Sequence, residues 1–283
     1  MIPEVETKRL GTIFGVDPTV VDQDYALGWM LAGLFSNEKI AKEWIFKGGT
    51  SLKKCWFPDY RFSVDLDFTV VGHLETDSVK SFLKESFELT ANVSGINWHA
   101  EAPVFEMVSD EYGHESVQVR IYHRSSIRYR GSAQSIQIDL SRDEFLAFPP
   151  VKRTMYHPYS DTGSLPLVSI PCYTLEEVLA EKLRAVGGQR RYALARDVYD
   201  IHQLSESGVD IKKTILVLDK KFEAKGLELH SGIVDDFVKR KADYELDWDH
   251  HVRPLEAGES AIFEDAFQKV ADLLERVLEA YSS

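Results

Sequence analysis

The stretch that decides the fold runs from Lys47 to Val70 and reads KGGTSLKKCWFPDYRFSVDLDFTV. It begins where a short apolar segment, Trp44–Phe46, reaches the glycine pair Gly48-Gly49. A glycine pair between a strand and a helix lets backbone N–H groups approach a phosphate at the positive end of the helix dipole. The first half of the stretch is therefore interpreted as a strand, a phosphate-binding turn and a helix with Thr50 or Ser51 near its N-cap.

The second half of the stretch carries two aspartates on a strand. In VDLDFTVV, Asp65 and Asp67 lie two residues apart, so both carboxylates point from one face of the strand. Leu66 and Phe68 occupy the opposite face, which indicates that the strand is half buried. Two carboxylates beside a phosphate suit Mg²⁺, and such a pair can hold two ions about 4 Å apart. Because the glycine turn and the D-x-D pair occur together, we favour a metal and phosphate site over an ordinary turn and a solvated strand face.

The neighbouring segments predict that this strand belongs to a mixed α/β sheet. Apolar residues at helical spacing predict helices at Thr19–Phe35 and Asp77–Asn92. Runs of β-branched and alternating apolar residues predict three more strands, at Val104–Val108, Ser116–Tyr122 and Ile136–Leu140. This order of helices and strands is typical of a mixed α/β sheet.

The second part of the sequence is predicted to be helical. Residues 148–171 contain repeated prolines and glycines with little periodicity, so we expect a connecting stretch there. Helices are expected to follow at Leu175–Val186, Ala193–Ser205, Ile211–Glu223, Ile233–Tyr244 and Ala261–Tyr281. The chain is therefore expected to form two domains, an α/β (α+β) lobe over residues 1–165 and a helical lobe over residues 166–283.

The size and composition of the chain exclude several classes of protein. With 283 residues it can bury a sufficient core without disulfides or a structural metal. Its two cysteines, Cys55 and Cys172, lie far apart in the sequence, which indicates a reducing compartment. The N-terminal residues lack the regions of a signal peptide, and no run of about 18 apolar residues occurs. We therefore expect a cytoplasmic protein with no membrane association.

The formal net charge of −13 is unevenly distributed. Residues 242–283 contain eleven acidic and three basic residues, which account for −8 of the total. Two windows, Arg120–Arg130 and Lys182–Arg196, contain four arginines each and no acidic residue. An anionic ligand is expected to bind at these windows, so the net charge limits where a nucleic acid can bind, not whether it binds.

Two groups of residues resemble a known protein family. The first is Gly48-Gly49-Thr50-Ser51 followed by Arg61-Phe62-Ser63-Val64-Asp65-Leu66-Asp67-Phe68. The second is Glu181-Lys182-Leu183-Arg184-Ala185 followed by Arg196-Asp197-Val198-Tyr199-Asp200. Their residues and order resemble the AbiEii/AbiGii nucleotidyltransferase toxins, a family within the DNA polymerase β-like nucleotidyltransferase superfamily. The resemblance covers roughly residues 45–204, and the last 79 residues share only their helical character.

The resemblance implies a nucleotidyltransferase-type mixed-sheet lobe and a helical lobe that completes an active-site cleft. Asp65 and Asp67 would bind Mg²⁺ or Mn²⁺, and Lys182 and Asp197 would be required active-site residues. Lys182 can neutralise phosphate charge as a point cation, although a lysine on such a helix can also be a solvated surface residue. The residues that would contact the nucleotide and its triphosphate are Gly48, Gly49, Thr50, Ser51, Ser63 and Arg196.

Three positions have more than one interpretation. Asp139 lies on the polar face of its strand, where it can be a third carboxylate that deprotonates the acceptor hydroxyl or a strand-edge residue without a role. Asp197 can orient Lys182 or Arg196, or contact the nucleotide. Ser63 can be a loop residue bonded to its own backbone, or a hydroxyl beside the triphosphate whose phosphorylation silences the enzyme.

The histidine motifs favour no competing site. Asp249-His250-His251 lacks a third ligand at helical or strand spacing and is interpreted as a solvated turn. His157 lies in the connecting stretch and has no serine or cysteine nucleophile paired with it. We therefore propose neither a histidine metal site nor a hydrolase triad.

The resemblance thus implies a Mg²⁺-dependent toxin of a toxin–antitoxin or abortive-infection system. It would transfer NMP from an NTP to an acceptor hydroxyl with release of pyrophosphate, and the family suggests tRNA 3′ ends as acceptors and a cognate antitoxin as partner. Arg190 and Arg191 are the chosen RNA contacts, the alternative being a solvated helix junction. Two other hypotheses remain, a protein or small-molecule acceptor and a catalytically idle module that binds a nucleotide or a partner.

Overall fold

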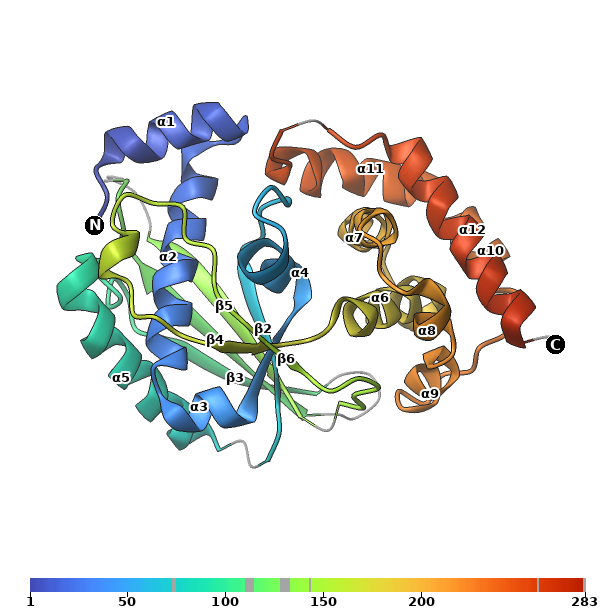
Figure 1. The fold of residues 1–283 in the computed structure, drawn as a ribbon, viewed down its shortest axis with the longest axis horizontal. Helices are drawn as coiled ribbons and strands as arrows, with labels where there is room; N and C mark the ends of the chain where they lie inside the picture. The colour runs from blue at the N-terminus through green and yellow to red at the C-terminus, as the bar shows by residue number, and fades with distance from the viewer. Residues whose placement is uncertain (73–74, 110–114, 128–132, 143, 259, 282–283) are drawn as a thin grey trace. The chain divides into compact units, whose positions relative to one another are not determined.

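Figure 1 shows the computed structural model of the chain, which describes residues 1–72, 75–109, 115–127, 133–142, 144–258 and 260–281. Seven strands of the described residues form one mixed sheet in the order β3-β4-β5-β2-β1-β7-β6. The strands are β1 (Trp44–Lys47), β2 (Asp65–Val70), β3 (Val104–Ser109), β4 (Glu115–His123), β5 (Gln134–Ser141), β6 (Val151–Arg153) and β7 (Ile170–Cys172). Because β2 pairs with both β1 and β5, the strand that carries the two aspartates is central in the sheet.

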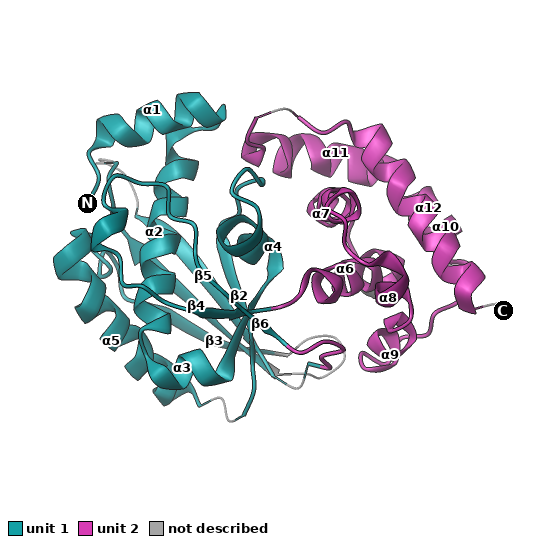
Figure 2. Ribbon diagram, viewed as in Figure 1, with its two compact units in different colours: residues 1–144, 150–172 teal, residues 145–149, 173–283 magenta. Residues whose placement is uncertain are grey.

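The chain divides into two compact units, which Figure 2 shows in two colours. Unit 1 comprises residues 1–144 and 150–172 and contains the sheet. Unit 2 comprises residues 145–149 and 173–283, and its described elements are helices. The mixed α/β fold class predicted from the sequence is confirmed. The units differ from the predicted division between residues 165 and 166 in their assignment of residues 145–149 and 166–172.

One face of the sheet is apolar and buried. Leu66 and Phe68 of β2 are fully buried, whereas Asp65 and Asp67 are partly exposed. The Phe68 ring lies with its centroid 5.2–5.9 Å from those of Phe35, Trp44 and Phe46. On β5 the same alternation buries Ile136, Ile138 and Leu140. The burial of these side chains fixes the register of the strands, because a shift by one residue would bury the aspartates.

Two helices of unit 1 pack on each other, α2 (Pro18–Phe35) and α5 (Thr76–Ser94). In α2 every residue from Val21 to Phe35 is buried, so this helix is enclosed on all sides. Its N-cap is Asp17, whose carboxylate accepts a hydrogen bond from the Thr19 N–H at 2.8 Å. The helix predicted from Thr19 is therefore confirmed within one residue.

Two strands lie in the stretch that the sequence predicts to be a connection, so that prediction is wrong for these residues. β7 pairs in parallel with β1 through Phe46 and Cys172, and β6 pairs with β7. Each strand has three residues, and Pro171 in β7 has no N–H to donate. Strands this short show no periodicity in the sequence.

β7 also brings Cys172 beside Cys55, and the hydrogen bond between the thiols and their burial raise the pKa of Cys172.

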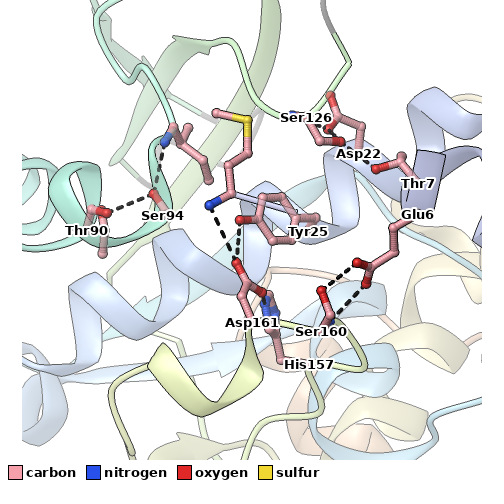
Figure 3. Close-up of polar contacts among 12 residues, drawn as sticks. Glu6, Thr7, Asp22, Tyr25, Thr90, Ser94, Ser126, His157, Ser160 and Asp161 are labelled. Carbon is pink, nitrogen blue, oxygen red and sulfur yellow. Dashed lines mark hydrogen bonds and ion pairs between the residues drawn. The ribbon is translucent and has the colours of Figure 1, made fainter. Parts of the chain in front are cut away.

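Polar contacts attach the same stretch to the N-terminal helices, as Figure 3 shows. The Glu6 carboxylate, on α1 (Glu4–Phe14), accepts hydrogen bonds from the Ser160 N–H at 2.9 Å and the Ser160 hydroxyl at 2.5 Å. The Tyr25 hydroxyl of α2 donates to Asp161 Oδ2 at 2.7 Å, beside the buried ring of His157. Residues 150–172 are therefore an integral part of unit 1.

Unit 2 contains the helices α6 (Leu175–Arg184), α7 (Ala195–Glu206), α8 (Ile211–Ile215), α9 (Leu218–Glu223), α10 (Ile233–Lys239), α11 (Lys241–His251) and α12 (Phe263–Tyr281). The single helices predicted over residues 211–223 and 233–244 are each divided into two. The second division falls at Arg240, where the backbone leaves helical geometry with φ −94° and ψ 10°. In unit 1, α1 and α3 (Glu38–Glu43) are additional to the predicted helices. Over the described ranges, no helix has both the length and the apolar character that a membrane span requires.

Candidate active site

Polar side chains form a row across the sheet, on the face opposite the apolar core. Lys47 on β1 is opposite Asp67 on β2, Asp67 is opposite Asp139 on β5, and Asp139 is opposite Gln118 on β4. Residues opposite one another on paired strands share a face of the sheet and lie about 5 Å apart. Asp65 lies on the same face, two residues before Asp67. The three carboxylates that the sequence singles out are therefore neighbours.

The carboxylate of Asp139 is held by two glutamine side chains. Its Oδ2 accepts a hydrogen bond from Gln137 Nε2 at 3.0 Å, and Gln118 is a second donor. Its Oδ1 is buried and has no hydrogen-bond partner among the described residues. Burial raises the pKa of the Asp139 carboxyl, and the two amides and Lys47 only partly oppose this shift. An oriented carboxylate with an oxygen that has no hydrogen-bond partner among the described residues and with a raised pKa is a candidate general base.

Gly48 is packed against the carboxylate of Asp67. Its φ is +75°, in the left-handed region that favours glycine, and a Cβ there would lie 2.3 Å from Asp67 Oδ2. Any other residue at this position would therefore displace the carboxylate. The cause is the antiparallel register of β1 and β2, which brings the end of β1 beside Asp67. The glycine turn and the carboxylate thus depend on each other.

A buried arginine lies against the second glycine. Arg61 is 2% exposed and donates a hydrogen bond to the Phe62 carbonyl oxygen at 3.2 Å. A Cβ at Gly49 would lie 2.7 Å from Arg61 Nη2 and 3.3 Å from Ser63 Oγ. The arginine and serine of the R-x-S motif therefore pack directly against the glycine turn. Ser63 is itself buried, so a kinase can reach its hydroxyl only after this loop opens.

The two hydroxyls that follow the glycines are bonded to the backbone. Thr50 Oγ1 donates to the Asp65 carbonyl oxygen at 2.5 Å, and Ser51 Oγ donates to the Gly48 carbonyl oxygen at 2.8 Å. Thr50 thereby ties the turn to β2, the strand that carries the aspartates. Both side chains are fully buried, so their immediate role is to fix the turn.

The helix after β1 begins earlier than the sequence predicts. α4 (Gly48–Ser51) starts at the first glycine with Lys47 as N-cap, so the predicted N-cap at Thr50 or Ser51 is wrong. The helix continues as a π-helical turn, Leu52–Trp56. Glycine tolerates the positive φ needed to enter the helix directly from the strand. As a result, Gly48 and Gly49 contribute the first backbone N–H groups of the helix, which have no partner within it.

Lys47 is a site residue that the sequence analysis does not single out. Its Nζ donates to Ser141 Oγ at 2.8 Å and lies 3.6 Å from Glu144 Oε1. In register it is the residue opposite Asp67. Its position directly before the glycine pair, at the end of a strand, is the signal that can identify it. Gln137 carries a similar signal, since it lies two residues before Asp139 and on the same strand face.

A second charged cluster lies in unit 2. Lys182 on α6 has its Nζ 2.5 Å from Asp197 Oδ1 and 3.0 Å from Asp200 Oδ2. The two aspartates are three residues apart on α7, which puts them on one face of the helix, and both carboxylates are almost completely buried. Arg190 Nε lies 3.2 Å from Asp197 Oδ2. The structure thus brings Lys182 and Asp197 together and adds Asp200, which the spacing in R-D-x-Y-D can reveal.

The basic residues of this cluster keep Asp197 ionised. Burial alone would raise the pKa of its carboxyl, but the charges of Lys182 and Arg190 outweigh burial and lower the pKa below its ordinary value. Of the two basic partners that the sequence suggests for Asp197, Lys182 is in contact with it, and Arg190 is an additional partner. Arg196 is half-buried on α7.

The two arginines predicted to contact RNA have different surroundings. Arg190 is paired with Asp197, and its carbonyl oxygen accepts a hydrogen bond from Arg240 at 3.0 Å. Arg191 is exposed and lines a cavity of about 410 Å³ in unit 2, together with Tyr192, Arg240, Asp243, Asp247, His250 and His251. In the other basic window, Arg120 is exposed on β4, whereas Arg128 and Arg130 lie outside the described residues.

The two histidine motifs have defined positions, one in each unit. Asp249-His250-His251 ends helix α11 instead of forming a turn, and His251 Nδ1 lies 2.7 Å from Asp247 Oδ1. His157 is buried in unit 1, and a Cβ at Gly28 would lie 2.3 Å from its ring. His157 is therefore packed against α2.

A divalent cation would bind at Asp65 and Asp67. Mg²⁺ is usually held by one or two carboxylates together with substrate phosphates and water. Across the ranges that the structure describes, no group of three or more His, Cys, Asp or Glu side chains forms a complete metal site. Two partly exposed carboxylates on one strand face therefore fit a cation that completes its coordination with phosphate oxygens.

A mixed sheet with a glycine turn beside paired carboxylates on the neighbouring strand defines a nucleotidyltransferase-type protein. Comparison with known families agrees, because the sequence matches the family described as "Nucleotidyl transferase AbiEii toxin, Type IV TA system" over residues 29–275. Since the match covers most of the chain, the protein belongs to this family of nucleotidyltransferase toxins, and the predicted resemblance is confirmed. A toxin of a toxin–antitoxin system implies an antitoxin as partner. A comparison with curated proteins gave no match.

The contact between Gly48 and Asp67 can be tested with the Gly48→Ala substitution. We expect it to lower the free energy of unfolding by about 1–2 kcal/mol for the left-handed backbone, and by about 1–3 kcal/mol more for the overlap with Asp67. Gly15→Ala is the matched control, since Gly15 has φ +73° and no atom near its Cβ position. Urea unfolding of both variants measures the difference. Equal losses in the two variants would contradict a tight contact at Gly48.

The buried cluster in unit 2 can be tested with Lys182→Met. This substitution leaves Asp197 and Asp200 without their shared cation, so we expect a loss of about 3–5 kcal/mol in the free energy of unfolding at pH 7. As the pH falls toward the ordinary pKa of aspartate the loss should shrink, because without the lysine burial raises the pKa of the two carboxyls and they become protonated above that ordinary value. Denaturant unfolding at several pH values measures this, with exposed Lys212→Met as the control. A Lys182→Met protein as stable as the wild type at pH 7 would refute the ion-pair network.

Proposed function

We propose that the protein transfers NMP from an NTP to a 3′ hydroxyl of RNA, with release of pyrophosphate. The proposed RNA acceptor is tRNA. The observation that carries this proposal is the row of carboxylates, in which Asp65, Asp67 and Asp139 share one sheet face beside the turn at Gly48. Family membership supports nucleotidyl transfer as the chemistry. The proposal further includes an RNA acceptor, a divalent metal ion, the roles of the individual residues and a cytoplasmic location.

Asp139 would accept the proton of the acceptor hydroxyl. Its Oδ1, which has no hydrogen-bond partner among the described residues, can take that proton while Oδ2 remains bonded to Gln137. The acceptor oxygen then forms a bond to the α-phosphorus as the bond between that phosphorus and the bridging oxygen of the β-phosphate breaks. Pyrophosphate leaves with the bonding electron pair. A general base of this kind contributes about 10²–10⁴-fold to the rate.

The glycine turn and the paired aspartates would hold the triphosphate. The first N–H groups of α4, at Gly48 and Gly49, can donate to phosphate oxygens. Asp65 and Asp67 would hold Mg²⁺ or Mn²⁺, and the bound ion supplies charge neutralisation for the phosphates and the leaving pyrophosphate. Arg61, buried behind Gly49, keeps a positive charge close to the turn.

The cluster in unit 2 would serve the same reaction. Asp197 and Asp200 hold the Lys182 ammonium in one orientation. A lysine fixed in this way is a preorganised point cation for phosphate charge that develops during transfer. Arg190 and Arg191 would contact the RNA backbone, and Arg196 the nucleotide. Lys182 is also expected to stabilise the fold. The activity of a Lys182 variant therefore has to be compared with the free energy of unfolding of the same variant.

Incubation with each labelled NTP, Mg²⁺ and total tRNA tests this proposal. We expect label in tRNA for the wild type and loss of transfer by at least about 10³-fold for Asp67→Asn, because a metal ligand is removed. Asp77→Asn, a change at an exposed aspartate on α5, is the control and should retain activity. Label on protein or on a small molecule would shift the proposal to those acceptors. NTP binding without any transfer would leave only the catalytically idle module.

The pH dependence of transfer tests the role of Asp139. A general base acts in its ionised form, and burial raises the pKa of Asp139. We therefore expect kcat/KM to fall as the pH decreases through a midpoint above the ordinary aspartate pKa of about 3.9. Gln137→Leu removes a hydrogen bond that lowers this pKa, so the midpoint should move to higher pH. An acid limb that is unchanged by Gln137→Leu and still present in Asp139→Asn would assign the base to another residue.

A further inference from the structure

A cavity in unit 1 continues the carboxylate row toward the edge of the sheet. It has a volume of about 220 Å³ and is lined by residues of three strands, among them Glu106 on β3, Gln118, Arg120 and Tyr122 on β4, and Gln137 on β5. The roles proposed above give this cavity no ligand. This is below the volume of about 300–1,000 Å³ that is typical of ligand pockets, so the cavity has room for one nucleoside at most, with any attached phosphate outside it.

The strand register connects this cavity to the catalytic carboxylates. Gln118 is opposite Asp139, and Asp139 is opposite Asp67. One row further along, Arg120 is opposite Gln137, and Gln137 is opposite Asp65. Neighbouring strands lie about 4.8 Å apart, so β4 is one strand from Asp139 and two strands from the aspartate pair. The cavity therefore opens on the same sheet face as the site.

The cavity and the glycine turn lie on opposite sides of the aspartate pair. In the order β3-β4-β5-β2-β1, the turn at Gly48 follows β1, the aspartates are on β2 and the cavity is on β3 to β5. In phosphoryl transfer the attacking and leaving oxygens are roughly in line on opposite sides of the phosphorus. If the triphosphate lies at the turn, the acceptor must approach from the side of Asp139, where the cavity is.

The residues that line the cavity match the chemistry of one nucleoside with its phosphate. Arg120 is exposed and positively charged, which suits a phosphate oxygen. Glu106 and the amides of Gln118 and Gln137 offer acceptors and donors for base and ribose groups. The same two amides hold Asp139, so a nucleoside in the cavity would lie against the residues that orient the general base.

We infer that this cavity binds the terminal nucleoside of the RNA acceptor, with Arg120 on the phosphate that precedes it. The inference rests on the proposed function for the nature of the acceptor and adds the place where that acceptor binds. It assigns Arg120 as a substrate-binding residue, and Gln118 and Gln137 as positioning residues for Asp139. In this assignment the 3′ hydroxyl of the bound nucleoside would face Asp139, which lies opposite Gln118 in the strand register.

Direct binding measurements on the full chain test the assignment. Fluorescence anisotropy measures the Kd of a short 5′-fluorescein-labelled single-stranded RNA with a free 3′ hydroxyl, and displacement of a fluorescent NTP analogue measures nucleotide binding. We expect Arg120→Ala to raise the RNA Kd at least about tenfold, as for a lost charged contact. The slope of log K against log salt should fall by about 0.7, the value for one phosphate contact on a single strand. Nucleotide binding should not change.

Arg9→Ala is the matched control, because it removes the same charge from an exposed position on α1 of unit 1. We expect it to change the RNA Kd less than twofold. Equal effects of the two substitutions, an Arg120→Ala protein that loses NTP binding instead, or a wild type that does not bind the RNA would each overturn the assignment.

The failure of the proposed function gives a different result. RNA binding that depends on Arg120, without incorporation of label into any RNA, would remove the transfer reaction and leave the binding site. The opposite result is label incorporated into RNA, at low RNA concentration, equally well by wild type and Arg120→Ala. It would support the transfer reaction and refute the binding site at Arg120. The catalytic and binding claims are therefore separated by the same pair of proteins.

Discussion

The close approach of Gly48 to Asp67 is the constraint on which the site of unit 1 depends. A backbone with φ +75° whose Cβ position is 2.3 Å from a carboxylate oxygen admits only glycine. The same approach sets where α4 begins, because the chain turns into the helix at this residue. It also sets where Asp67 points, since the turn limits the space for its carboxylate. The first backbone N–H groups of α4 and the Asp67 carboxylate are thus held next to each other by the fold itself.

Both charged clusters depend on burial. The apolar face formed by Leu66 and Phe68 keeps β2 in register, so Asp65 and Asp67 stay on the other face. In unit 2, Lys182 and two buried aspartates form an ion-pair network. Removal of one partner would leave a buried charge without compensation. Such networks are costly to disturb, which explains how a lysine on a helix can be fixed in position rather than solvated. In unit 2, a residue proposed for catalysis is therefore also expected to contribute to stability.

The parts of the fold that the sequence predicted well have strong local patterns. The buried helix α2 and the alternating strand β2 follow directly from the spacing of their apolar residues. The short strands β6 and β7 do not, because three residues show no period and Pro171 argues against a strand. Within the site, motif residues such as Asp65 and Asp67 were recognisable from spacing. Lys47 and Gln118 owe their places to strand register, which joins positions that are distant in the sequence.

The central claim is that Asp65 and Asp67, next to Gly48, hold a divalent cation together with the nucleotide phosphates. Titration with Mn²⁺, followed by electron paramagnetic resonance in the presence of a non-hydrolysable NTP analogue, tests this claim directly. We expect bound Mn²⁺ only when the analogue is present, because two carboxylates leave most coordination positions to phosphate and water. Replacement of both aspartates by asparagine should abolish that signal while the protein remains folded. Mn²⁺ binding that persists unchanged in the doubly substituted protein would contradict the account.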